Sequence, residues 1–271
     1  MTALQVSTVH DHPHTKYGEK ITMSTTTARQ MLDSAAPTNA QDPGGDDAPS
    51  QAIRSQRKAS LTAGIALALL AALSVFGNFI AINPLVTPGD AAKTAQSILA
   101  SETMFRWGIA SLILVAIGDI IVASALLTLF RPVNRGVSTA AAWFRAAYAA
   151  VYLTGISQLL IAVTVVAEPG QASRAIEAFN TIWQASLILF AVHLLLEGYL
   201  AYRSGFMPKV FGILLVIAGL GYLTDGFGAV LISGYSFGIG RFTFVGEVAL
   251  ILWLLIKGTR MTDVKAANSA R

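Results

Sequence analysis

Long apolar segments recur between residues 61 and 257 and are separated by short polar turns. They cover residues 61–82 and about 107–130, 138–167, 179–202, 209–232 and 241–257. An α-helix needs about 20 apolar residues to cross a hydrocarbon core about 30 Å thick, and most of these segments approach that length. The strands of a membrane barrel would alternate in polarity over roughly ten residues, and no such alternation is present. The pattern predicts an all-α fold, a polytopic bundle of about six transmembrane helices.

Composition supports a membrane protein and divides the chain. Hydrophobic residues make up 54% and charged residues 13%, where a soluble domain has about 25% charged residues. Residues 1–58 are rich in Ser, Thr, Ala, Asp and Pro, which predicts a disordered tail. Residues 59–258 form the predicted membrane domain, and residues 259–271 form a second short tail. No apolar stretch follows Met1, so we expect no cleavable signal peptide.

Basic residues predict the orientation of the spans. One set of helix ends carries Arg54, Arg57, Lys58, Arg131, Arg135, Arg203, Lys209, Lys257, Arg260 and Lys265, whereas the opposite ends carry Lys93, Arg106, Arg174 and Arg241. The positive-inside rule then places both termini in the cytoplasm of a cell with the protein in its inner membrane. On this topology Trp107 and Trp183 lie at the outer interface, and Trp143 and Trp253 lie at the inner one.

The connection 87–107 is the longest one on the outer side. Asp90 is a candidate N-cap for a short helix there. Ile98, Leu99 and Met104 would then rest on the membrane interface. An ordinary ordered loop explains the same residues equally well, so both interpretations stay open.

Several stretches resemble a known family. "TPGDAAKTAQSILASETMFRWGIA", "FRPVNR", "HLLLEGYLAYRSGFMPKVFGILLVIAGLGYLTDGFG" and "GEVALILWLLIKG" occur in this order and are similar to bacterial membrane proteins grouped as the domain of unknown function 4386 family. The resemblance covers roughly residues 60–258. It implies an inner-membrane protein of about six helices with no assigned activity, so it carries over no functional residues.

Ionisable side chains lie inside the predicted spans, where each charge costs about 2.5–3.5 kcal/mol on insertion scales. They are Asp119, Arg145, His193, Glu197, Asp225 and Glu247. At about 1.5 Å per residue from the inner ends, Arg145 and Glu197 lie roughly 8–10 Å deep, which predicts an ion pair between them. Asp119, His193 and Glu247 lie roughly 14–17 Å deep, near the midplane, and Asp225 lies closer to the outer face.

Helical spacing adds further polar residues to this cluster. Ser186, His193 and Glu197 share one helical stripe, and Tyr148 and Tyr152 share another with Arg145. We therefore predict one intramembrane polar cluster of Asp119, Arg145, His193, Glu197 and Glu247, with Asp225, Tyr148, Tyr152 and Ser186 as secondary members. Four carboxyls cannot be neutralised by one Arg and one His, so some are protonated, hydrated or bound to a cation, and we expect this of Asp119 or Glu247.

Most enzyme classes fit the sequence poorly. His193 is the one histidine within the spans, H-E-x-x-H is absent, and "TGISQ" around Ser157 is not G-x-S-x-G. No Cys, P-loop or dinucleotide fingerprint is present, so we expect no catalytic residues, metal or cofactor. A carrier of a small solute or cation remains, with the lipid bilayer as a partner and no nucleic acid. The alternative is a non-catalytic accessory protein whose polar groups only specify helix packing.

The predicted topology can be tested with reporter fusions. Reporters placed at residue 58, in the 131–136 turn and at the C-terminus should all report the cytoplasm, because these points carry the excess of Lys and Arg. Activity of a periplasmic reporter at either terminus would contradict the topology.

Overall fold

The structure is a computed structural model that describes residues 47–235, 238–239 and 245–256. Residues 1–46, and with them most of the predicted tail, lie outside the described residues, as does the tail 259–271. The account below concerns the compact unit Ala48–Arg271. The described residues contain helices and no strand, which confirms the all-α class.

Each predicted span contains a helix, but several helices start earlier than predicted; α6, for example, begins at Pro169 and not near residue 179. In chain order they are α2 (Asp47–Val75), the π-helix η1 (Phe76–Ile82), the 3-10 turn η2 (Asn83–Leu85), α3 (Ala91–Ala100), α4 (Glu102–Phe130), α5 (Arg135–Thr164), α6 (Pro169–Arg203), α7 (Lys209–Leu231) and α9 (Val245–Ile256). Helix α2 begins at Asp47, inside the segment that composition assigned to the disordered tail.

Five helices are long and apolar enough to cross a membrane: Ser55–Leu85, α4, α5, α6 and α7. The chain is therefore a multi-pass membrane protein. The described part of α9 is a shorter apolar helix, Gly246–Ile256, within the segment predicted as the sixth span.

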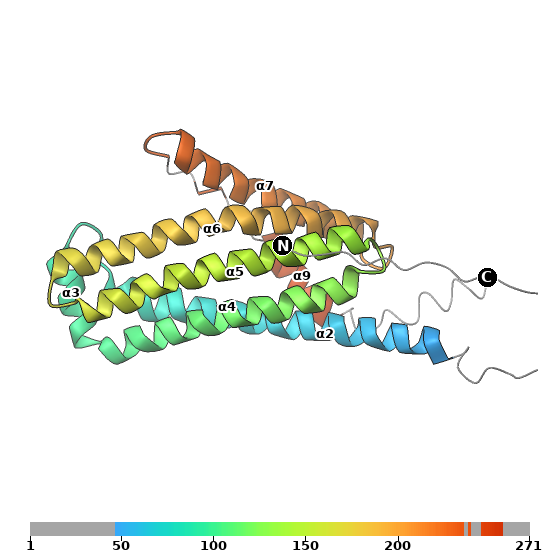
Figure 1. Cartoon of the computed structure of the whole chain (residues 1–271), viewed down its shortest axis with the longest axis horizontal. Coiled ribbons are helices and arrows are strands. Elements are labelled where there is room, and N and C mark those ends of the chain that lie inside the picture. The colour runs from blue at the N-terminus through green and yellow to red at the C-terminus, as the bar shows by residue number, and fades with distance from the viewer. Residues whose placement is uncertain (1–46, 236–237, 240–244, 257–271) are drawn as a thin grey trace, which may run out of the picture. The chain divides into compact units, whose positions relative to one another are not determined.

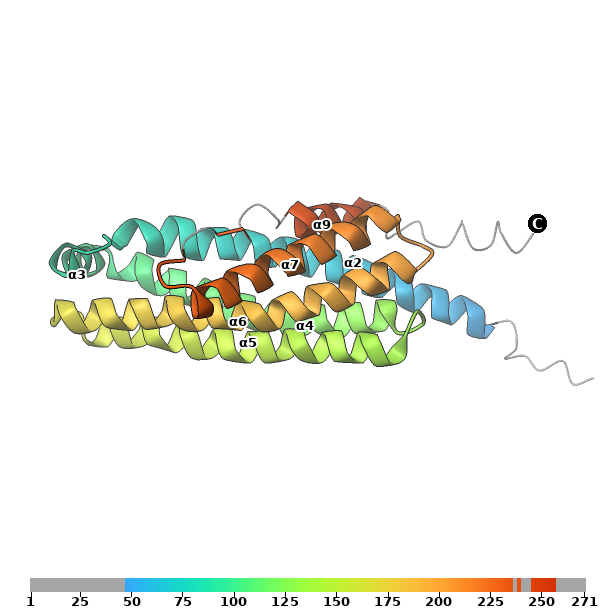
Figure 2. The ribbon, with the colours of Figure 1, turned by 90° about the horizontal axis from the view of Figure 1, so that it is seen from above.

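Neighbouring helices in the chain are also neighbours in space (Figures 1 and 2). Helix α4 packs on α5, α5 on α6, α6 on α7, and α7 on α9, while η1 packs on α4. Gly64 of α2 faces Leu254 and Leu255 of α9, so the first and last described helices also meet. This arrangement gives α2, α4, α5, α6, α7 and α9 a common interior.

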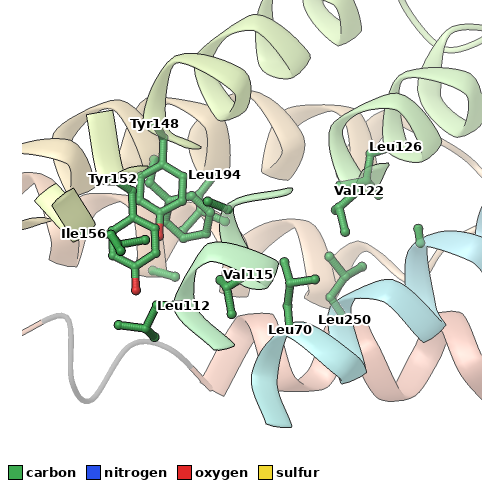
Figure 3. Packing of buried hydrophobic residues seen from close by; sticks show 14 of the residues in the cluster. Leu70, Leu112, Val115, Val122, Leu126, Tyr148, Tyr152, Ile156, Leu194 and Leu250 are labelled. Carbon is green, nitrogen blue, oxygen red and sulfur yellow. The ribbon is translucent and has the colours of Figure 1, made fainter. Parts of the chain in front are cut away.

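Buried aromatic and aliphatic side chains fill much of that interior (Figure 3). The rings of Tyr148 and Tyr152 stack with centroids 5.8 Å apart, and Phe190 of α6 lies 4.9 Å from Tyr148. Leu70 of α2 and Leu250 of α9 belong to the same buried cluster. The polar stripe predicted on α5 therefore faces the bundle interior, with its two tyrosines embedded in apolar side chains.

The connection before α4 contains the predicted short helix. The Asp90 carboxylate accepts a hydrogen bond from the Lys93 backbone N–H at 2.9 Å, which confirms the N-cap. Ile98 is fully buried in the core, where α3 packs on α6, so its predicted place at the membrane interface is wrong. Leu99 and Met104 are exposed.

The tryptophans divide into two groups. Trp107 and Trp143 are 64% and 72% exposed, as expected of side chains that face lipid and headgroups. Trp253 is buried against Phe206 and Phe211, and Trp183 is half-buried against Phe179. Trp253 therefore faces protein side chains near the start of α7, and its place at the level of the inner interface stays a prediction.

Glycines let α6 and α7 approach to backbone contact. A Cβ built on Gly212 would lie 2.6 Å from the Gly198 carbonyl oxygen, and one built on Gly198 would lie 2.8 Å from the Gly212 carbonyl oxygen. A Cβ on Gly219 would lie 2.9 Å from the carbonyl oxygen of Ala191. Small residues at such contacts are typical of closely packed membrane helices.

We expect Gly212→Ala to destabilise the bundle. The added methyl must push α6 and α7 apart, which should cost about 1–3 kcal/mol. Gly170→Ala is the matched control, because nothing lies within 4 Å of its Cβ position near the start of α6. The control should be neutral or stabilise the helix by up to about 1 kcal/mol. Thermal unfolding in detergent measures both, and equal midpoints would contradict the close approach.

Candidate functional site

A buried ion pair joins α4 to α5. The Arg145 guanidinium donates to Asp119 Oδ1 from Nε at 2.9 Å and from Nη2 at 2.6 Å. Both residues are buried, Asp119 to 2% and Arg145 to 4% exposure. Each charge thus has a counter-ion in place of the hydration that it loses on burial. The ion pair offsets much of the cost of placing the two charges in the membrane interior.

His193 extends this ion pair to α6. Its Nε2 lies 3.1 Å from Arg145 Nη1, and its Nδ1 lies 2.9 Å from the Ala141 carbonyl oxygen. Arginine can only donate and a carbonyl can only accept, so Nε2 must accept and Nδ1 must carry the proton. His193 is therefore assigned as the neutral Nδ1–H tautomer. The guanidinium also lies 5.4 Å from the centre of the Phe190 ring, within cation–π range.

The structure gives Arg145 a different partner from the predicted one. Among the described residues, Arg145 forms no ion pair with Glu197, and Asp119 takes that place. The reason is the start of α5, which lies at Arg135 and not near residue 138. Arg145 is therefore about 15 Å from its helix end, at the level of Asp119 and His193, while Glu197 is about 9 Å from the end of α6.

Glu197 and Glu247 face a small cavity at the centre of the bundle. The cavity has a volume of about 20 Å³, and every helix of the common interior contributes to its wall. The wall consists of Leu67, Leu126, Arg145, His193, Leu194, Glu197, Leu215, Glu247 and Leu250. A polar cavity of this size has room for about one water molecule. The shared lining shows that four of the five predicted cluster residues meet around one space.

The two glutamates differ in their hydrogen bonds. Glu247 accepts a hydrogen bond from the Tyr222 hydroxyl at 3.0 Å. Glu197 is 2% exposed, and its Oε2 has no hydrogen-bond partner among the described residues. A buried carboxyl oxygen without a partner is costly, so this atom is the unsatisfied point of the cluster.

The fifth member and the secondary residues lie apart from the cavity. Asp119 is shielded by Arg145 and is absent from the cavity wall. Ser186 donates to the Trp183 carbonyl of its own helix at 2.6 Å. Asp225 accepts hydrogen bonds from the Tyr235 hydroxyl and the Ile239 N–H, both at 2.8 Å, at the end of α7 remote from Lys209. The hydrogen bond from the Tyr235 hydroxyl to Asp225 raises the pKa of Tyr235, which lies outside the spans.

Sequence reasoning missed Tyr222 and Phe190. Tyr222 lies in "GLGYLTDGFG", three residues before Asp225. A tyrosine hydroxyl inside a span needs a hydrogen-bond partner, and that need was the available signal. Phe190 lies three residues before His193 on the same helical face, but an aromatic residue in an apolar run carries no distinguishing signal.

The described residues offer little to a metal ion. No group of three or more His, Asp or Glu side chains is placed among them to hold one. The arrangement instead contains two carboxyls beside one water-sized space, next to an arginine whose charge Asp119 already balances. Such an arrangement can bind and release a proton or hold a hydrated one.

Comparisons with known proteins identify relatives without an assigned activity. The model of the family described as "Domain of unknown function (DUF4386)" matches residues 62–258. An "Uncharacterized protein" from Archaeoglobus fulgidus is 37% identical over 158 residues, which cover 58% of this chain and 88% of the relative. No solved structure matches the chain.

Replacing Arg145 by Met should leave Asp119 buried without a counter-ion and cost about 3–5 kcal/mol of unfolding free energy. The same change at Arg106, whose ion pair with Glu102 is exposed, should cost less than about 1 kcal/mol. Adding Asp119→Asn to Arg145→Met should recover most of the loss, measured by unfolding in detergent. Recovery by Glu197→Gln in place of Asp119→Asn would show that Glu197 is the partner after all.

Proposed function

The chain belongs to the family described as domain of unknown function 4386, and we propose that it is a cation carrier in which Glu197 and Glu247 bind and release a proton. The observation that carries the proposal is the buried Oε2 of Glu197, which no residue in the described part of the chain hydrogen-bonds. Glu197 lies on the wall of a water-sized cavity. A group that only specified packing would be expected to have both oxygens satisfied.

Charge balance supports a role for these two glutamates. Asp119 and Arg145 neutralise each other, and the hydrogen bonds of His193 leave that ring neutral. Glu197 and Glu247 then share one cavity without a cation of their own. Two carboxylates cannot both stay ionised at close range in a low-dielectric interior, so a proton or another cation must compensate one charge.

The size and lining of the cavity favour a proton over larger cargo. A volume of about 20 Å³ holds about one water molecule, so the described state has no room for an organic solute. His193 also lines the cavity, but both of its ring nitrogens are engaged, and no group of three His, Asp or Glu side chains among the described residues could hold a metal ion. A proton, carried with or without one water molecule, fits both conditions.

The proposed carrier crosses the inner membrane six times, with α9 as the sixth crossing and both termini in the cytoplasm. The five long apolar helices and the apolar character of α9 support the crossings. The Lys and Arg residues at the two ends of the bundle support the orientation. On this orientation Asp225 and its hydrogen bonds lie at the outer end of α7.

Packing alone accounts for a different part of the cluster. The chain of contacts from Asp119 through Arg145 and His193 to the Ala141 carbonyl is closed, with each polar group satisfied. Such a chain joins α4, α5 and α6 and needs no further purpose. It leaves the unpartnered oxygen of Glu197 unexplained, which is why the carrier proposal rests on the glutamates.

Proton flux in proteoliposomes tests the proposal. A potassium diffusion potential across the vesicle wall should drive proton entry, followed with a trapped pH-sensitive dye. Glu197→Gln and Glu247→Gln should each reduce the flux to that of protein-free vesicles, because an amide cannot exchange the proton. Both variants should stay folded, since Gln is nearly isosteric with Glu.

Glu102→Gln is the matched control, because Glu102 is a partly exposed membrane-end carboxylate in a surface ion pair. It should leave the flux unchanged. Wild-type protein without flux above empty vesicles would contradict the proposal. Flux that survives both glutamine variants, together with unchanged or higher stability, would instead assign the glutamates to packing.

A further inference from the structure

A groove between α2 and α4 lies apart from the central cavity. It has a volume of about 440 Å³, within the range of sites that take a drug-sized ligand. Its polar and apolar walls include Ser55, Lys58 and Thr62 of α2 and Ile121, Ser124 and Thr128 of α4. We refer to it as the α2–α4 groove.

Helix α2 lies close to α4 at Leu70 and Gly118, and the groove lies between the same two helices nearer the start of α2. A Cβ on Gly118 of α4 would lie 2.3 Å from Leu70 Cδ1, and one on Gly77 of η1 would lie 2.5 Å from the Ser111 hydroxyl oxygen. Beyond Leu70, toward the start of α2, α4 has no comparable glycine, and the helices separate. The residues that line the groove therefore lie in the first part of α2 and the last part of α4.

The lining changes from polar to apolar along the groove. Helices α2 and α4 run in opposite directions (Figure 1). Ser55 and Lys58, near the start of α2, therefore lie toward the same end of the groove as Thr128, near the end of α4. Ile120 and Ile121 lie deeper, about 14 Å from that end. This order matches a phospholipid, whose charged headgroup lies at the membrane surface and whose acyl chains lie beneath it.

The polar side chains of the groove could bind an anion and accept hydrogen bonds from a ligand. Among the described residues, no carboxylate pairs with Lys58, so its ammonium is available to an anion. The hydroxyls of Ser124 and Thr128 donate to carbonyls of their own helix, both at 2.9 Å. Their oxygens remain available as acceptors, as a headgroup with hydroxyl donors would require.

We propose that the α2–α4 groove binds one anionic phospholipid, with its phosphate on Lys58 and an acyl chain along Ile120 and Ile121. A phosphatidylglycerol headgroup would also donate its hydroxyls to Ser124 and Thr128. The exposed surface beside the groove is apolar and continues along both helices through Leu61, Ile65, Leu69, Leu114 and Ile117. A lipid would reach the groove from this exposed surface without displacing any of the described residues.

Native mass spectrometry of the purified full chain tests the headgroup contact. The protein is offered equal amounts of phosphatidylglycerol and phosphatidylcholine with identical acyl chains. Wild-type protein should prefer phosphatidylglycerol by roughly fivefold, the expected effect of one basic residue near an anionic lipid. Lys58→Gln should abolish the preference. Arg57→Gln removes the same charge from the next residue, which does not line the groove, and should keep the preference.

A second pair of variants tests the acyl-chain contact. Ile121→Trp should fill the groove from its wall and reduce bound lipid of both kinds. Leu114→Trp adds the same ring at an equally exposed position of α4 outside the groove and should leave bound lipid unchanged.

The proposal would be overturned by a wild-type protein without headgroup preference, by equal effects of Lys58→Gln and Arg57→Gln, or by equal lipid binding of the two tryptophan variants. Competition by free glycerol phosphate at the same concentration as the lipid would show that the groove recognises a soluble phosphate, which would also overturn it.

Discussion

The ion pair between Asp119 and Arg145 sets the arrangement of the bundle around it. An arginine cannot stay unpaired in the middle of a membrane without a cost of several kcal/mol, so α5 can pack only where its charge meets a counter-ion. Asp119 supplies that counter-ion from α4, and His193 supplies an acceptor from α6. Because these contacts are directional, they fix the rotation of three helices about their own axes as well as their neighbours.

The rest of the bundle is held by a different interaction. Helices α6 and α7 meet through glycines at backbone distance, and α7 meets α9 where a Cβ on Gly246 would lie 2.7 Å from the Leu214 carbonyl oxygen. Across this side, the Tyr222–Glu247 hydrogen bond joins α7 to α9. Glu197 and Glu247 therefore lie between two parts of the bundle. Helices α4, α5 and α6 are joined by the ion pair and its hydrogen bonds, and α6, α7 and α9 are joined by close packing at glycines. A rearrangement of α7 and α9 would expose the cavity without breaking the ion pair.

The sequence predicted the features that depend on periodicity and composition. Five long apolar helices, the cap at Asp90, the family and the inward direction of Arg145, His193 and Glu197 all followed from residue spacing and polarity. The partner of Arg145 did not, because depth changes by about 1.5 Å per residue and a helix start misplaced by three residues moved Arg145 to the wrong level. That error also reversed the roles of the carboxyls: Asp119 has the counter-ion that was assigned to Glu197. Contacts such as Tyr222 with Glu247 depend on the rotation of two helices, which no local pattern encodes.

Helix α2 connects the central cavity to the membrane surface. Leu67 lines the cavity, while Lys58 and Thr62, about two turns before it, line the α2–α4 groove. The helix is held to α4 at Leu70 and to α9 at Gly64, and between its start and these contacts the groove separates it from α4. A lipid in the groove would thus contact the start of α2 on the side that faces α4, while Ser60 and Ala63 are buried against the rest of the described protein. The position of Leu67 over the cavity depends on the packing of α2 at Gly64 and Leu70, and a lipid in the groove would add a further contact to the same helix.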